Sequence, residues 1–206
     1  MKILTYRGRE YGANCHLMFD EQARKACLID PGEYDTRVEE AIERHELAVE
    51  YIILTHGHFD HTLGAVKFKE ETGAKIAAHE LEAEYLEDPS KSLTSMAGGA
   101  KITADVLFKD GDILTVGDIQ LKVMHTPGHT KGSCCFICDV ISDEPLVFTG
   151  DTLFRNGIGR YDLYGGDYST LMASLEKLGR LGDNCKIYPG HKGVSTIGRE
   201  LGGQDL

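Results

Sequence analysis

Four side chains of the types that bind metal ions fall within one stretch of six residues. These candidate ligands are His56, His58, Asp60 and His61. From the histidine and aspartate content of the chain, such a spacing is expected by chance with a probability on the order of 0.001. Imidazole combined with carboxylate suits zinc, iron or manganese. The stretch therefore predicts a metal site.

The spacing of these residues has a geometric explanation. Residues i and i+2 of an extended chain face the same side, so His56 and His58 can reach one ion. A helix expected to begin near Thr62 would turn Asp60 and His61 toward a second ion. Asp60 could instead simply cap that helix, so the interpretation needs support from elsewhere in the chain.

Three further candidate ligands each lie shortly after an apolar segment that reads as a strand. They are His129, Asp151 and His191, after the segments Leu121 to Met124, Leu146 to Phe148 and Ile187 to Tyr188. Sites often assemble at strand ends, because rigid strands aim the loops that follow them. A lone histidine is more often a surface or core residue, but such simpler explanations would have to hold at all seven positions at once. We therefore predict a metal centre, which leaves out His16, His45, His79 and His125.

The elements that must position these residues alternate between strands and helices. Strands are expected at Lys2 to Tyr6, Cys15 to Phe19, Ala26 to Ile29, Tyr51 to Leu54, Lys75 to Ala78, Asp105 to Phe108, Ile113 to Val116, Ile119 to His125, Ser133 to Cys138, Leu146 to Thr149 and Lys186 to Tyr188. Helices are expected at Arg37 to Leu47, Thr62 to Thr72, Ser169 to Leu181 and Val194 to Leu201, with more helical residues between Ala78 and about Met96. This order fits a sheet-on-sheet core flanked by helices, in one domain over residues 1–206.

Composition argues against several classes of partner. The formal net charge of −11, from 22 basic and 33 acidic residues, argues against a nucleic-acid surface. No apolar run approaches the roughly 20 residues of a membrane span, so no membrane partner is expected. The segment Met1 to Arg7 has no signal-peptide character, which predicts a cytoplasmic protein. The sequence does not indicate an oligomeric state.

The six cysteines are interpreted as small buried residues. A chain of this size does not need a disulfide framework. Cys135 and Cys138 have the spacing of a redox pair, but they lie inside a predicted strand. A redox pair would normally open a helix after a strand.

Through these motifs the sequence resembles the metallo-β-lactamase superfamily over nearly its whole length. The matching segments are Asp30-Pro-Gly, the His-x-His-x-Asp-His motif at 56–61, the His-Thr-Pro-Gly-His-Thr segment that contains His129, Gly150-Asp-Thr-Leu-Phe, Gly157-Ile-Gly-Arg and Tyr188-Pro-Gly-His. The resemblance implies a four-layer αββα sandwich of the α/β class.

The resemblance also implies a role for each ligand. The ligands of the first ion would be His56, His58 and His129, and those of the second would be Asp60, His61 and His191. Asp151 would bridge the two ions, and Asp30 would orient a ligand from behind. The expected cofactors are two divalent ions, zinc ahead of iron or manganese.

Within the superfamily, the segment from Asp151 to Arg160 is similar to the glyoxalase II group, and especially to its short bacterial members. That group hydrolyses S-lactoylglutathione. The implied substrate is a small acyl thioester with an anionic thiol carrier. Arg160 would contact this carrier, although a salt bridge to Asp162 or Asp167 is the simpler role for an arginine in a loop.

The expected reaction is attack of a metal-bound hydroxide on the thioester carbonyl. A metal ion lowers the pKa of water from about 15.7 to about 7, so that hydroxide exists at neutral pH. Asp60 would be catalytic, because it would orient this hydroxide or accept its proton. A thiolate leaves without a dedicated acid, since a thiol has a pKa of about 8.5.

Other functions fit the same residues. The segment Gly159-Arg-Tyr-Asp162 is also similar to a motif of persulfide dioxygenases, which would use one iron on His56, His129 and Asp151. A lactonase, a phosphodiesterase and a non-enzymatic metal-binding module are further alternatives. A β-lactamase is disfavoured, because Asp151 stands where those enzymes typically have a cysteine.

Overall fold

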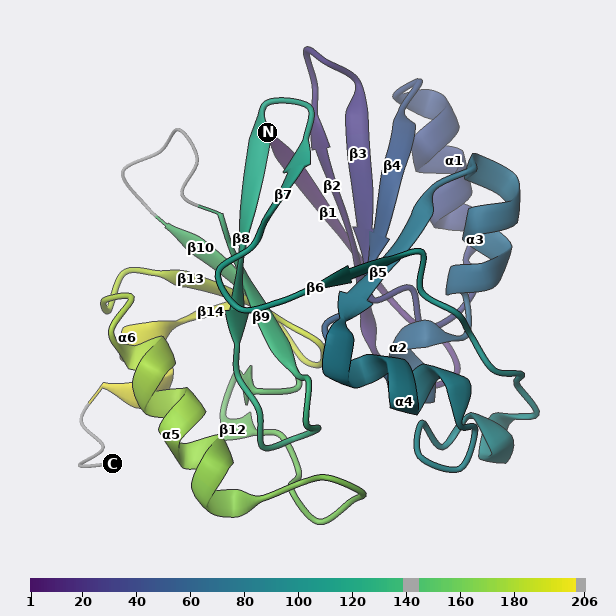
Figure 1. The fold of residues 1–206 in the computed structure, drawn as a ribbon. Helices are drawn as coiled ribbons and strands as arrows, with labels where there is room; N and C mark the ends of the chain where they lie inside the picture. Colours follow the sequence, from purple (N-terminus) through teal and green to yellow (C-terminus); the bar gives the residue numbers. More distant parts are fainter. Residues whose placement is uncertain (139–144, 203–206) are drawn as a thin grey trace.

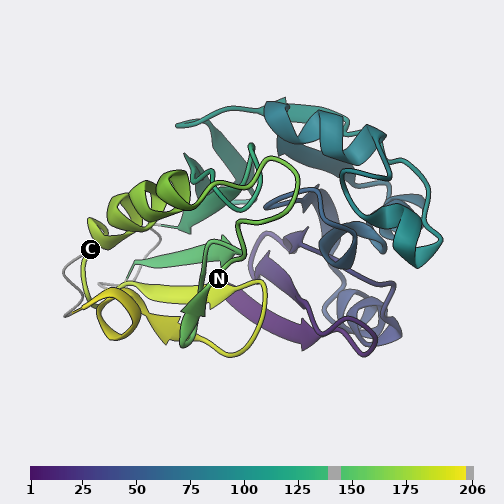
Figure 2. The same ribbon diagram turned by 90° about the horizontal axis from the view of Figure 1, so that it is seen from below.

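The computed structural model describes residues 1–138 and 145–202, and the rest of the predicted 1–206 domain lies outside the described residues. Two six-stranded sheets face each other, with helices on the outer side of each (Figure 1). Figure 2 shows the molecule from below. The helix α5 (Tyr168–Gly179) lies beside the sheet of the C-terminal half, and α4 (Ala83–Glu87) lies on the side of the sheet of the N-terminal half. The predicted four-layer αββα sandwich is therefore confirmed.

The N-terminal half forms the first sheet. Its strands, in spatial order, are β1 (Lys2–Arg7), β2 (Asn14–Asp20), β3 (Lys25–Ile29), β4 (Ala48–Ile53), β5 (Lys75–His79) and β6 (Val106–Phe108). The strands from β1 to β3 pair antiparallel, and those from β3 to β6 pair parallel. Parallel neighbours need a crossover connection, which α1 (Thr36–Arg44) and α3 (Ala65–Thr72) provide on either side of β4.

The C-terminal half forms the second sheet. Its strands, in spatial order, are β14 (Ser195–Thr196), β13 (Lys186–Pro189), β10 (Leu146–Gly150), β9 (Cys134–Cys138), β8 (Ile119–His125) and β7 (Ile113–Val116). The pairs are antiparallel except for β10 with β13. A separate small hairpin joins β11 (Leu153–Phe154) to β12 (Gly157–Ile158). The crossover between β10 and β13 carries α5, which covers this sheet from outside (Figure 1).

Three apolar layers hold the four structural layers together. Between the sheets lies a fully buried cluster that includes Ile53 and Phe148. Outside the first sheet, Phe68 of α3 belongs to a second cluster, and outside the second sheet Leu171 of α5 belongs to a third. Burying one such side chain stabilises the fold by about 1.5–3 kcal/mol. The sheets are therefore a rigid base for the loops at their ends.

Several predicted elements were wrong in their limits. The helix expected at 62–72 is two helices, α2 (Phe59–Thr62) and α3, because the amide of the intervening Gly64 donates to the Pro31 carbonyl at 2.9 Å instead of to the carbonyl four residues earlier. The helical stretch expected up to Met96 consists of short pieces, η1 (Glu80–Glu82), α4 and η2 (Thr94–Ala97). The last helix, α6 (Ile197–Leu201), begins only after β14, and the β11–β12 hairpin was not predicted.

All six cysteines are buried, with Cys135 and Cys138 inside β9 as the sequence indicated. Among the described residues, no helix combines the length and the apolar character that crossing a bilayer requires.

A stacked histidine pair joins the two sheets at one edge. His79 ends β5 and His125 ends β8, and their rings lie parallel with centroids 4.4 Å apart. Burial first, and then the neighbouring His125, lower the pKa of His79 from 6.5 to about 4. The folded state therefore favours a neutral His79.

The lowered pKa of His79 predicts that the folded protein loses stability in acid. The unfolded chain takes up the proton of His79 near pH 6.5, whereas the folded chain does so only near pH 4, so stability falls as the pH drops through that window. Each pKa unit corresponds to about 1.4 kcal/mol. His79→Asn, whose Oδ1 matches the Nδ1 that accepts the Leu81 amide, should flatten the dependence of Tm on pH in chelator-treated protein. An unchanged slope would contradict this role.

Candidate metal centre

The seven predicted ligands come from loops and turns that follow strands of both sheets. His56 and His58 follow β4, and Asp60 and His61 lie in the short helix α2. The other three, which are His129, Asp151 and His191, follow β8, β10 and β13. The structure brings all seven side chains together at the ends of these strands.

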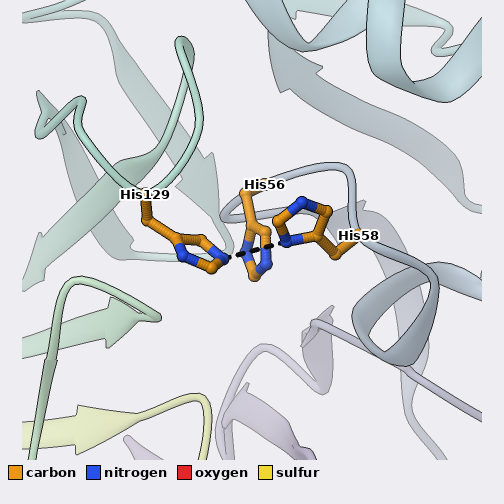
Figure 3. A group of neighbouring side chains, drawn as sticks. All are labelled: His56, His58 and His129. Carbon is orange, nitrogen blue, oxygen red and sulfur yellow. Dashed lines mark hydrogen bonds between the residues drawn. The ribbon is translucent and has the colours of Figure 1, made fainter. Parts of the chain in front are cut away.

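Three histidines form the first group of candidate donors. One ligand atom from each of His56, His58 and His129 lies within 4.8 Å of the others. Figure 3 shows their rings turned toward one another, with His58 Nδ1 2.9 Å from His129 Nε2. The buried His56 Nε2 has no hydrogen-bond partner. Unsatisfied buried nitrogen atoms are costly, so this group fits a cation that the nitrogens would ligate.

A second group lies beside the first and includes Asp60, His61 and His191. His191 Nε2 is 3.1 Å from Asp60 Oδ2 and 3.3 Å from His61 Nε2. This group is the more accessible one, because the His191 side chain is 25% exposed and that of Asp60 19%, while His56 is only 1% exposed. A substrate would therefore approach from the side of Asp60 and His191.

Asp151 lies between the two groups. Its Oδ1 is 3.3 Å from His61 Nε2, while its Oδ2 is 3.7 Å from both His129 Nε2 and His191 Nε2. Oδ1 makes no well-formed hydrogen bond although it is buried. A carboxylate that faces both groups is suited to bridging two cations, and this observation favours a dinuclear centre over a single ion.

Hydrogen bonds from behind fix the orientation of four histidine rings. The partners of their Nδ1 atoms are Thr55 Oγ1 for His56 at 3.0 Å, Asp30 Oδ2 for His61 at 3.0 Å, the Arg160 carbonyl for His129 at 2.7 Å and the Gly12 carbonyl for His191 at 3.3 Å. A partner at Nδ1 leaves Nε2 for a metal ion. The protein thus presents Nε2 of each of these rings to the centre.

Asp30 lies behind His61, and the family resemblance leads us to expect that it orients this candidate ligand. It adopts a left-handed backbone conformation with a φ of 52° just after β3. One carboxylate oxygen accepts the Thr55 amide at 2.7 Å, and the other accepts the Thr55 hydroxyl at 2.6 Å and faces His61. Thr55 was not predicted as a site residue, although it directly precedes the histidine motif.

The local electrostatics suit metal binding. Burial first, and then neighbouring histidines, hold the pKa of His56 well below 6.5, and burial and His129 lower that of His58 to about 3. Burial opposes ionisation of Asp151, but His61 outweighs it and lowers the pKa of that carboxyl. Burial also opposes protonation of His61, yet Asp151 and Asp60 raise its pKa. A bound cation would take the place of that proton.

Glycines allow the loops to approach the centre. A Cβ on Gly190 would lie 2.4 Å from Asp151 Oδ1 and 2.7 Å from His61 Cε1. A Cβ on Gly159 would lie 1.7 Å from the Asp151 carbonyl oxygen. A side chain at Gly190 would therefore displace the Asp151 carboxylate, and one at Gly159 would displace the Asp151 backbone.

Arg160 lies near the centre but points its charge at a carboxylate. Its side chain is 58% exposed and donates two hydrogen bonds to Asp162, at 2.8 and 2.9 Å. This is one of the two ion pairs that the sequence left open. Its carbonyl oxygen accepts from His129, a contact that the sequence did not reveal.

Comparison with known proteins agrees with this geometry. The sequence model of the metallo-beta-lactamase superfamily matches residues 8–191. Hydroxyacylglutathione hydrolase GloC of Haemophilus influenzae is 36% identical over 192 residues, which covers 91% of this chain and 89% of that protein.

Two solved structures share the fold over nearly the whole of both chains. The BLEG-1 B3 metallo-beta-lactamase has a TM-score of 0.88 and 31% identity, covering 97% of this chain and 96% of the other. The di-iron-bound form of TTHA1623 has a TM-score of 0.80 and 29% identity, covering 95% and 96%.

The position of Asp151 predicts unequal effects of two substitutions on metal content. Asp151→Ala should release metal from both groups, because this carboxylate faces both, whereas Asp60→Ala should leave the ion of the three-histidine group. Elemental analysis after dialysis measures this difference, with the exposed Asp162→Ala as a control that keeps all metal. Retention of both ions by the Asp151 variant would rule out the bridging role.

Proposed function

This chain belongs to the metallo-β-lactamase superfamily, and we propose that it is a dinuclear-metal hydrolase of acyl thioesters, of the glyoxalase II type. The observation that carries the proposal is Asp151, whose carboxylate lies between two groups of donor side chains. The similarity to a hydroxyacylglutathione hydrolase, at 36% identity over most of both chains, supports the thioester class. Zinc is the proposed metal, and iron or manganese suits the same donors.

Two divalent ions would supply polarisation of the substrate carbonyl and a water molecule with a pKa of about 7. The three-histidine group would hold one ion, and Asp60, His61 and His191 the other, with Asp151 shared between them. These side chains need no large movement, because their donor atoms already converge. Such preorganisation is where much of the catalytic power of hydrolases arises.

Asp60 is the proposed catalytic carboxylate. Burial works to raise its pKa, but His61 and the hydrogen bond from His191 outweigh burial and lower it. Asp60 is therefore ionised at neutral pH and can accept a proton from the attacking water. Its partial exposure places it on the accessible side of the centre. The leaving thiolate needs no proton donor, since its pKa is only about 8.5.

β-Lactam hydrolysis is a second candidate although Asp151 disfavours it, because a solved structure named as a B3 metallo-beta-lactamase shares 31% identity and nearly the whole fold. The same nucleophile could attack a β-lactam carbonyl. The thioester proposal is preferred because the leaving amine of a lactam needs a proton and a thiolate does not.

Oxygen dependence separates hydrolysis from the persulfide dioxygenase alternative. The protein, loaded with zinc and in a separate sample with iron, should hydrolyse S-lactoylglutathione at the same rate with and without oxygen, because no redox step is involved. The release of free thiol under nitrogen measures this, while oxygen uptake is followed with glutathione persulfide and ring opening is followed by ultraviolet absorption with a β-lactam. Oxygen consumption with the persulfide and no anaerobic hydrolysis would overturn the proposal in favour of the dioxygenase.

The proposed contact of Arg160 with the thiol carrier predicts a defect in KM. A remote anchor binds ground state and transition state alike, so Arg160→Ala should raise KM and leave kcat nearly unchanged. A charged hydrogen bond is worth enough to raise KM by roughly 10- to 150-fold. Asp162→Asn, which removes the competing carboxylate, is the matched control and should not raise KM. If an uncharged thioester suffers equally from Arg160→Ala, the residue is structural.

A further inference from the structure

We propose that two buried side chains, Glu82 and Asn14, each hold one half of the metal centre in place. Glu82 positions the three-histidine group, and Asn14 positions His191 in the other group. Neither was singled out in the sequence, and neither is a predicted ligand. The inference rests on the proposed dinuclear function.

Glu82 ties together the two loops that carry the three histidines. Its side chain is fully buried at the end of η1. One carboxylate oxygen accepts the Gly57 amide at 2.6 Å. The other accepts the Thr130 hydroxyl at 2.6 Å and the Gly132 amide at 2.7 Å. One oxygen therefore serves the loop between His56 and His58, and the other serves the loop that follows His129.

Two glycines make this bridge sterically feasible. A Cβ on Gly57 would lie 2.6 Å from Tyr85 Cβ and 3.0 Å from Glu82 Oε2. A Cβ on Gly132 would lie 2.8 Å from Glu82 Oε1. Both loops thus press their backbones against the same carboxylate. The 2.9 Å separation of His58 Nδ1 and His129 Nε2 joins these two loops directly, so it depends on how Glu82 spaces them.

Asn14 holds the loop that presents His191. Its side-chain amide donates to the Pro189 carbonyl at 2.9 Å and to the Lys192 carbonyl at 2.8 Å. Its backbone amide donates to the Gly190 carbonyl at 2.6 Å. Asn14 begins β2 of the first sheet, and it is 3% exposed. Asn14, which belongs to the first sheet, therefore binds the backbone on both sides of His191, which follows β13 of the second sheet.

The two bridges act on different donors. The Glu82 contacts flank His56, His58 and His129, and the Asn14 contacts flank His191. Substitutions behind metal ligands typically weaken metal binding by about 10- to 100-fold. Substitution of Glu82 or of Asn14 should therefore lower the affinity for one metal ion and leave the affinity for the other unchanged. A general loss of stability would lower both affinities.

The test is a titration of the metal-free protein with Co²⁺, followed by visible absorption and competition with a chelator. The variants His58→Ala and His191→Ala supply reference spectra in which one group is damaged. Glu82→Gln keeps the shape but places an amide donor against an N–H donor. It should weaken the three-histidine ion about 10- to 100-fold and give the His58→Ala type of spectrum. Asn14→Leu should give the His191→Ala type.

If Glu82→Gln fails to fold, a milder variant can test the same contact. Thr130→Val removes one donor to Glu82 and keeps both backbone donors, so it should weaken the same ion by a smaller factor. The Tm of each metal-free variant is measured in parallel. Weakening of both ions together, in step with a lower Tm, would overturn the proposal and leave Glu82 and Asn14 as general structural residues.

The outcome also distinguishes this inference from the proposed function. If the wild-type chain binds a single Co²⁺ ion, the dinuclear proposal fails. The role of Glu82 is then judged on the three-histidine ion alone, where unchanged affinity in both Glu82→Gln and Thr130→Val overturns it.

Discussion

The constraint on which this structure depends is the close approach of buried polar side chains from two separate sheets. Five imidazoles and two carboxylates converge at one place, where each unsatisfied polar atom is costly. The protein meets this cost by giving most rings a fixed partner at Nδ1, as Asp30 does for His61. Other atoms of the site, such as His56 Nε2, are buried without a hydrogen-bond partner. The site is therefore built to be completed by cations.

The sandwich makes this convergence rigid. The candidate ligands follow β4 of one sheet and β8, β10 and β13 of the other, so any sliding of the sheets would separate the donor atoms. The apolar cluster between the sheets resists such sliding. The core makes the sheets rigid. Hydrogen bonds between the two sheets, such as those from Asn14 to the loop of His191, also fix the positions of individual loops.

The sequence predicted what is local and missed what depends on distant partners. The histidine motif and the positions of candidate ligands after strands are local patterns. The order of strands and helices indicated a sheet-on-sheet core flanked by helices, and the family resemblance implied the αββα layering. The break at Gly64 depends on the hydrogen bond of its amide to the distant Pro31 carbonyl, and the β11–β12 strands have only two residues each, too few for periodicity. Glu82 lies in a stretch that reads as ordinary helix, while its partners Gly57 and Gly132 are 25 and 50 residues away.

The central claim is that this chain holds two metal ions with Asp151 between them. The most direct measurement is anomalous X-ray scattering from crystals of the protein purified from its own host. We expect two anomalous peaks, one among His56, His58 and His129 and the other among Asp60, His61 and His191, with Asp151 in contact with both. A single fully occupied peak, with the second group bound only to water, would contradict it.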